Sequence, residues 1–283
     1  MSSPAAAPTL AATTRLGATH LTVSDLDRSV RFYQDAIGLR VHSNEDGRAA
    51  LGAGGEDVLV LVEEPGAQPA GRHAGLYHVA LLYPSREELA FAVDRLIRTR
   101  TPVEGMSDHG THEAIYLPDP DGNGLELAAD RPRSEWPAGL GYSGGPAPLD
   151  VENLYALARE AEVPRFVGEG FRTGHLHLHV SELDAARDFY RDVIGFDVQF
   201  EMPTAVFLSA GGYHHHVAIN TWRGRGVPPV GAGTGSVVGM RHWTVVVTPE
   251  DLSAIAARAG AEITGGALEL PDPSGNVIRL ETA

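Results

Sequence analysis

The chain repeats itself, and this repeat limits its fold more than any other feature. Segments 20–41 and 177–198 share 12 identities in 22 aligned positions, including a Phe-Tyr pair and an Ile-Gly pair. A second motif also returns, because Pro-Asp-Pro-Asp-Gly-Asn at 118–123 reappears as Pro-Asp-Pro-Ser-Gly-Asn at 271–276. Self-similarity at such a spacing indicates duplication of one structural unit. We therefore expect several copies of one module.

Each copy has the pattern of a strand, a helix and three further strands. In the first copy an alternating strand ends at Ser24, whose hydroxyl can cap the next helix, and Asp25 lies in the first turn. The apolar face of that helix runs to Ile37, and Gly38 should end it. The third copy repeats this order at 181–195. Two further strand–helix starts, at 77–98 and 242–259, bring the number of modules to four.

These signals predict an α+β fold in which four βαβββ modules form two half-barrel pairs. The modules should lie near residues 15–64, 75–130, 173–222 and 238–283. As domains, we expect a flexible tail at 1–14, a first two-module domain at 15–130 and a second at 173–283. The Pro/Gly-rich connector at 131–172 should contain one helix, from Val151 to Ala161.

Composition narrows the possible partners and cofactors. A net charge of −15 with no block of Lys or Arg argues against nucleic acid and anionic membranes as partners. The absence of cysteine excludes disulfides, Cys-ligated zinc and thiol nucleophiles, so a metal would need His and carboxylate ligands. No apolar run reaches the roughly 18 residues of a membrane span, and the N-terminal residues lack a basic signal-peptide region. These features predict a cytoplasmic location.

Candidate functional side chains gather in two segments. His109, Tyr116 and Glu126 surround the turn at 118–124, and Glu126 alternates with two leucines, so its carboxylate points away from them and is either solvated or bound. In the third copy, His175 and the histidines two and four residues later share one strand face. Packing alone rarely places three histidines on one face, and we therefore expect a ligand among them.

The modules resemble the vicinal oxygen chelate superfamily, which includes glyoxalases, bleomycin-resistance proteins and extradiol dioxygenases. The resemblance lies in the Asp/Glu-Leu, Phe-Tyr and Ile-Gly pairs of modules one and three and in Asp-Pro-x-Gly-Asn of modules two and four. In that superfamily paired modules form a cupped half-barrel around a metal ion. Its ligand positions fall, in chain order, on Ala18, His78, Glu126, His175, His242 and Arg279.

This resemblance implies a metal triad of His78, His175 and Glu126, built between modules two and three. Modules one and four would then pair as a metal-free half. Two imidazoles and one carboxylate form the facial triad that binds Fe(II) and leaves open positions. Pairing of adjacent modules is the simpler layout, but it would leave both triads incomplete unless Glu281, on the strand face of Arg279, completed the second.

A more specific resemblance is to the extradiol, catechol 2,3-dioxygenase-like branch. His109, Tyr116, Asp119-Pro120-x-Gly122 and Glu126 follow the extradiol ring-cleavage signature, although Ser107 departs from its preferred Gly. In segment 213–218, His215 matches the second of consecutive histidines, which faces the active site. The resemblance implies an Fe(II)-dependent enzyme that cleaves a catechol-type aromatic diol with O2, with Mn(II) or another divalent metal as alternatives. His215, His109 and Tyr116 would act on protons and substrate oxygens.

Two other functions remain open at this point. A glyoxalase-type isomerase or lyase would hold Ni, Zn or Mn and normally use two carboxylates, whereas only Glu126 is placed here. A metal-free drug-binding protein would carry apolar residues at the ligand positions. The sequence does not determine the catechol, the metal, the oligomeric state or the roles of further histidines, namely His177, His179, His214 and His216. We assign no role to His42, His73 or His112.

Overall fold

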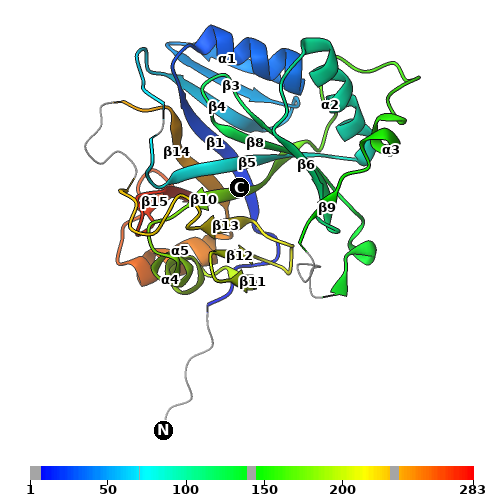
Figure 1. Cartoon of the computed structure of the whole chain (residues 1–283). Coiled ribbons are helices and arrows are strands. Elements are labelled where there is room, and N and C mark those ends of the chain that lie inside the picture. The colour runs from blue at the N-terminus through cyan, green and yellow to red at the C-terminus, as the bar shows by residue number, and fades with distance from the viewer. Residues whose placement is uncertain (1–7, 70, 139–144, 230–235) are drawn as a thin grey trace.

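A computed structural model describes residues 8–69, 71–138, 145–229 and 236–283, and it consists of two β-sheets with few helices (Figure 1). The strands of the first two modules are β1 (Arg15–Val23), β2 (Arg40–Glu45), β3 (Arg48–Gly52), β4 (Asp57–Glu63), β5 (Gly75–Tyr83), β6 (Gly105–Asp108), β7 (His112–Pro118) and β8 (Gly124–Asp130). The later strands are β9 (Ala147–Pro148), β10 (Arg172–His179), β11 (Asp197–Met202), β12 (Ala205–Ser209), β13 (Val217–Asn220), β14 (Gly239–Val246), β15 (Ala267–Pro271) and β16 (Val277–Glu281). The helical elements are α1 (Leu26–Phe32), η1 (Tyr33–Ile37), α2 (Arg86–Thr99), η2 (Arg133–Glu135), α3 (Val151–Tyr155), α4 (Leu183–Asp188), η4 (Phe189–Ile194) and α5 (Pro249–Ala259).

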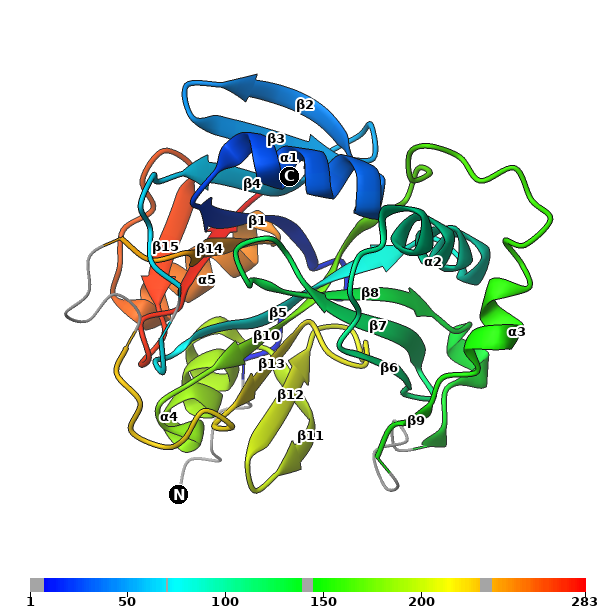
Figure 2. The same cartoon turned by 45° about the horizontal axis from the view of Figure 1, so that its top comes forward.

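Each sheet joins two modules through their first strands. The seven-stranded sheet, ordered β15-β16-β14-β1-β4-β3-β2, combines modules one and four. The nine-stranded sheet, ordered β11-β12-β13-β10-β5-β8-β7-β6-β9, combines modules two and three and adds β9 from the connector. Figure 2 shows β5 and β10 crossing the centre of the molecule beside each other, as their antiparallel pairing requires. The predicted pairing of module two with module three is confirmed, and the alternative of adjacent pairing is wrong for the sheets. The division into domains at 131–172 stays a prediction.

Two equivalent glycines allow the first strands to meet. A Cβ on Gly174 would lie 3.0 Å from the Leu82 Cβ on β5, and one on Gly17 would lie 3.0 Å from the Thr244 Cγ2 on β14. In both sheets the pairing register shifts beside the glycine. Such an irregularity bends a strand and redirects the following side chain. In the nine-stranded sheet that following side chain is His175.

The two repeated motifs meet in one contact between sequence-adjacent modules. The Tyr33 hydroxyl, at the start of η1, donates to the Asp119 carboxylate at 3.0 Å, and Tyr190 donates to Asp272 at 3.1 Å. Asp119 also accepts from the backbone N–H groups of Asp121 and Asn123, which closes the turn before β8. The helix motif of an odd module therefore anchors the turn motif of the next even module.

The beginning of α1 differs from the prediction. Asp25 caps this helix by accepting from the Arg28 backbone N–H at 2.9 Å, and Ser24 does not. The Ser24 hydroxyl instead donates to Asp121 of the second module at 2.6 Å, because that turn lies against the helix. The predicted end is confirmed, since Gly38 has a left-handed φ of 91° after the π-helical turn η1.

Three further details differ from the predicted outline. Module four has two strands after its helix instead of the predicted three. Where the first of the three was expected, the chain forms only an isolated bridge between Thr264 and Ala267, on either side of the Gly265-Gly266 turn. Helix α3 ends at Tyr155, where tighter turns replace the expected continuation. The described part of the predicted tail, residues 8–14, is packed, since Leu10 is buried and its N–H donates to Gly195 at 2.9 Å. Residues 1–7 lie outside the described residues. Within the described residues, no helix is both long and apolar enough to cross a membrane.

Candidate metal centre

The position of Glu126 depends on a close approach between β8 and β5. A Cβ on Gly124 would lie 1.9 Å from the Tyr77 carbonyl oxygen, so only glycine fits where β8 begins. Gly124 is required because it leaves space for the neighbouring strand, whereas Gly122 in the turn has a positive φ of 85°, which glycine adopts without strain. Parallel pairing then sets Glu126 beside Ala80. Glu126 is 1% exposed, and its carboxylate is therefore bound and not solvated.

The predicted triad comes together in the nine-stranded sheet. The Glu126 Oε2 atom lies 2.9 Å from the His78 Nε2 atom and 3.1 Å from the His175 Nε2 atom. Ligand atoms at right angles around an ion, each about 2.1 Å from it, are about 3.0 Å apart. The His78 Nε2 atom is buried and has no hydrogen-bond partner within the described residues, although the carboxylate is so near. An imidazole nitrogen directed past the carboxylate fits a shared ion better than a hydrogen bond, so these residues fit a divalent metal.

The charges at this site favour an ionised carboxylate. Burial by itself would raise the pKa of Glu126, but the charge of His175 and hydrogen bonds from the surrounding imidazoles outweigh it and hold the pKa well below its ordinary value. Burial lowers the pKa of His175, and the neighbouring Glu126 carboxylate opposes that shift. The site therefore presents one ionised carboxylate beside imidazole nitrogens that can ligate a metal.

The three residues predicted to act on the substrate line the same cavity as the triad. This cavity has a volume of about 340 Å³. Across it, His109 and Tyr116 form a pair, with 2.8 Å between the Nε2 and hydroxyl atoms. The His215 ring lies on another side, with its centroid 4.0 Å from that of His175. Burial lowers the pKa of His109 to about 4 and that of His215 well below its ordinary value.

The sequence reasoning missed His112, to which it assigned no role. The His112 Nε2 atom lies 3.1 Å from Glu126 Oε1, the carboxylate oxygen that does not face His78 and His175. A signal was available, because His112 and Tyr116 are four residues apart on β7 and must share a strand face. Behind His112 lies His214, which is fully buried and has its Nε2 atom 3.1 Å from Asp130.

Two more histidines of β10 have different surroundings. His177 lines the cavity, and its Nε2 atom is buried without a hydrogen-bond partner within the described residues. His179 bonds through Nδ1 to the Asn220 amide oxygen at 2.8 Å. Along this face of β10, His175 thus belongs to the triad, His177 lines the cavity and His179 makes a structural hydrogen bond.

The equivalent positions of the other sheet do not form a triad. His242 stacks on His20 with 4.0 Å between ring centroids. Arg279 occupies the position that Glu126 has in module two, and it pairs with Glu269 at 2.7 Å and with Glu281 at 3.2 Å. Glu281 is therefore engaged by a cation. Within the described residues, no three metal-ligating atoms converge in this sheet.

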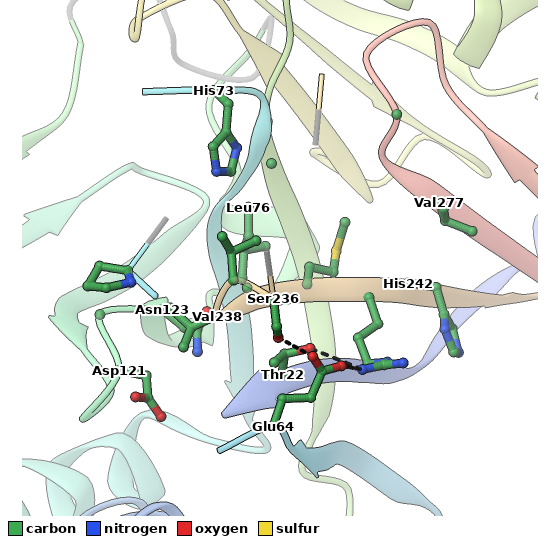
Figure 3. A pocket seen from close by; sticks show the side chains of 18 of the residues that line it. Thr22, Glu64, His73, Leu76, Asp121, Asn123, Ser236, Val238, His242 and Val277 are labelled. Carbon is green, nitrogen blue, oxygen red and sulfur yellow. Dashed lines mark hydrogen bonds and ion pairs between the residues drawn. The ribbon is translucent and has the colours of Figure 1, made fainter. Parts of the chain in front are cut away.

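A larger cavity, of about 750 Å³, lies between the turns of modules two and four and contains His73 and His242 (Figure 3). Its acidic side chains already have partners. Glu64 contacts Ser236 and Arg241, and Asp121 pairs with an arginine at 2.6 Å. Among the described residues, no group of three His, Asp or Glu ligand atoms converges there. The chemistry that the sequence predicts is concentrated in the smaller cavity.

Comparison with known proteins identifies the family. A model of the Glyoxalase/Bleomycin resistance protein/Dioxygenase superfamily matches residues 15–127 and 172–280. The chain is 40% identical over 273 residues to a catechol-2,3-dioxygenase of Bacillus subtilis (strain 168), and this alignment covers 92% of the chain and 94% of the relative. It is also 29% identical over 122 residues to a probable lactoylglutathione lyase of a Synechocystis species, covering 38% of this chain and 90% of that protein.

Solved structures share the fold. A proposed dioxygenase of Bacillus subtilis superposes with a TM-score of 0.66 at 15% identity and covers 98% of this chain and 86% of its own. Glyoxalase I of Zea mays superposes with a TM-score of 0.58 at 16% identity, covering 95% of this chain and 92% of its own. With two matched segments that span both halves of the chain and a relative similar over almost its whole length, the chain belongs to the glyoxalase/bleomycin resistance protein/dioxygenase superfamily.

Proposed function

We propose that this protein is an Fe(II)-dependent extradiol dioxygenase that cleaves a catechol-type aromatic diol with O2. The observation that carries the proposal is the convergence of the buried residues His78, His175 and Glu126 on one cavity that the His109–Tyr116 pair also lines. Similarity to a catechol-2,3-dioxygenase over most of the chain supports the same reaction. In this reaction both atoms of O2 enter the product, and a ring carbon–carbon bond beside the diol breaks.

The triad would hold the metal with the carboxylate Oε2 and two imidazole Nε2 atoms. When bound, Fe(II) supplies adjacent open positions for the diol and O2, and it acidifies a bound hydroxyl. A single carboxylate among the ligands leaves the ion with a net positive charge, which suits an anionic diol. The glyoxalase alternative needs a second carboxylate, and among the described residues lining this cavity only Glu126 is acidic.

The other polar side chains of the cavity would handle protons. His215 lies against His175, and burial lowers its pKa, so its neutral ring can accept a proton from a hydroxyl of the diol. The Tyr116 hydroxyl, paired with His109, can donate to a substrate oxygen while the ring nitrogen of His109 stabilises it. These groups approach the substrate from different segments: Tyr116 lies on β7, His109 lies in the turn between β6 and β7, and His215 precedes β13.

The cavity wall restricts the ring substituent of the substrate. Phe200, Met202, Phe207 and Trp222 form an apolar wall, and no Lys or Arg is among the described lining residues. A cavity of about 150 Å³ accommodates one benzene ring, so about 340 Å³ leaves room for a substituent. We propose that neutral alkyl- or aryl-substituted catechols are preferred over carboxylated ones, because a buried carboxylate would lack a cationic partner.

Anaerobic loading with Fe(II), followed by addition of O2 and catechols, tests the proposal. The expected result is consumption of one O2 per diol with formation of a yellow ring-fission product, faster for 3-methylcatechol than for 3,4-dihydroxybenzoate. His215→Ala should reduce turnover by roughly 10²–10⁴-fold, the usual contribution of positioned proton transfer. Absence of O2 uptake with every diol, or isomerisation of a glutathione hemithioacetal at a higher rate, would refute the dioxygenase assignment.

A further inference from the structure

The geometry points to His112 as a positioning residue that holds Glu126 in single-oxygen coordination and so keeps open the sites that the substrate and O2 need. This inference rests on the proposed function. It begins from the division of the Glu126 carboxylate. Oε2 faces His78 and His175, whereas Oε1 is 3.1 Å from His112 Nε2. Both oxygens are therefore engaged before any substrate arrives.

The proton arrangement of this contact follows from its partners. An ionised carboxylate only accepts hydrogen bonds, so His112 Nε2 must be the donor to Glu126. When His112 carries its ring proton on Nε2 alone, its Nδ1 accepts, and the Thr111 hydroxyl, 2.9 Å from Nδ1, donates to it. Thr111 is fully buried and His112 is 2% exposed, so water does not compete for either atom. The chain from Thr111 to Glu126 is thus directed toward the metal site.

Ring stacking fixes the orientation of His112. Its ring lies between those of His109 and His214, with 4.6 Å between centroids on each side and interplanar angles of 10° and 15°. His214 is in turn held by the Asp130 carboxylate at 3.1 Å. A ring clamped on both faces keeps its N–H aimed at one point. A carboxylate whose second oxygen is held in this way cannot rotate to chelate the ion with both oxygens.

The way Glu126 binds determines how many coordination positions on the metal stay open for the substrate and O2. Two imidazoles and one carboxylate oxygen would leave open positions on a bound metal for the two diol oxygens and O2. If Glu126 bound through both oxygens, one of those positions would be lost. Outer hydrogen-bond partners of metal ligands are typically worth 10–100-fold in metal affinity or activity. His112 has the geometry of such a partner.

The test measures Mn(II) affinity and the visible absorption of Co(II)-loaded protein, without turnover. His112→Phe keeps an aromatic ring in the stack but removes the N–H, and we expect its Mn(II) Kd to rise roughly 10–100-fold. The Co(II) absorption should change as the coordination of Glu126 changes. His112→Gln, which restores an N–H donor, should recover part of the affinity. Thr111→Val, nearly isosteric, should weaken binding in the same direction by a smaller factor.

His179→Phe is the matched control, because His179 is also a buried histidine of this sheet but bonds to Asn220 and not to Glu126. Its Mn(II) affinity and Co(II) spectrum should equal those of the wild type. Unchanged affinity and spectrum in both His112→Phe and Thr111→Val would overturn the inference while leaving the metal triad intact. If the wild type itself bound neither Mn(II) nor Co(II), the proposed function would fail, and the role of His112 would fail with it.

Discussion

Replacing Glu126 by Gln should remove most of the stabilisation that a divalent metal gives this protein. Glu126→Gln keeps the size of a side chain that is 1% exposed but removes the negative charge that lies 2.9 and 3.1 Å from the Nε2 atoms of the two triad imidazoles. Even an outer hydrogen-bond partner is worth 10–100-fold in affinity, so loss of the ligand itself should raise the metal Kd by at least about 100-fold.

The expected change in unfolding temperature follows from mass action. At a free metal concentration of 100 times the wild-type Kd, the wild type gains about 2.7 kcal/mol. At the same concentration a variant with a 100-fold weaker Kd gains only about 0.4 kcal/mol. With roughly 2–4 °C per kcal/mol for chains near this size, the metal should raise the Tm of the wild type by about 5–10 °C and that of the variant by less than about 2 °C.

Thermal unfolding with and without Mn(II) measures this difference, and each protein is compared with its own metal-free form. His242→Gln is the control, because His242 occupies the equivalent strand of the other sheet, where it stacks on His20. Its metal-induced rise should match that of the wild type. An equal rise in Glu126→Gln, or a rise lost only in His242→Gln, would refute the location of the metal in the nine-stranded sheet.

Three other predictions concern catalysis, pH and folding. Tyr116→Phe should lower kcat less than His215→Ala does and should leave the Mn(II) affinity unchanged, because the substitution removes one hydrogen bond to the substrate and no metal ligand. Steady-state kinetics and a metal titration measure the two effects. Burial lowers the pKa of His214 to about 3, so the stability that its neutral form contributes is complete above pH 6.5 and is lost as the pH falls toward 3. The free energy of unfolding lost by pH 5 is about 2 kcal/mol, so urea unfolding should show a smaller loss of stability between pH 7 and pH 5 in His214→Phe than in the wild type. Tyr33→Phe should destabilise the metal-free protein by about 1 kcal/mol, since buried Asp119 loses one of its hydrogen bonds, and an unchanged urea midpoint would contradict the anchoring role of that contact.

Several features were readable from the sequence because they depend on near neighbours. The repeat placed the modules, and alternation placed Glu126 on the face opposite its flanking leucines. Gly38 ends its helix as predicted, because the left-handed conformation of 91° is a local requirement of one residue. Local reasoning failed where a distant group competed, as at Ser24, whose hydroxyl bonds to Asp121 of the second module and leaves the cap to Asp25.

The choice of partners was decided by the tertiary structure. Alternation shows which face of β7 a side chain occupies, but it does not show that His112 contacts the Oε1 atom of Glu126. That contact depends on the pairing of β7 with β8 and on the approach of β8 to β5 at Gly124. The sequence also carried both repeated motifs without showing that Tyr33 bonds to Asp119, 86 residues away. Such contacts join residues that are distant along the chain, and their energies depend on burial that exists only after the sheets have packed.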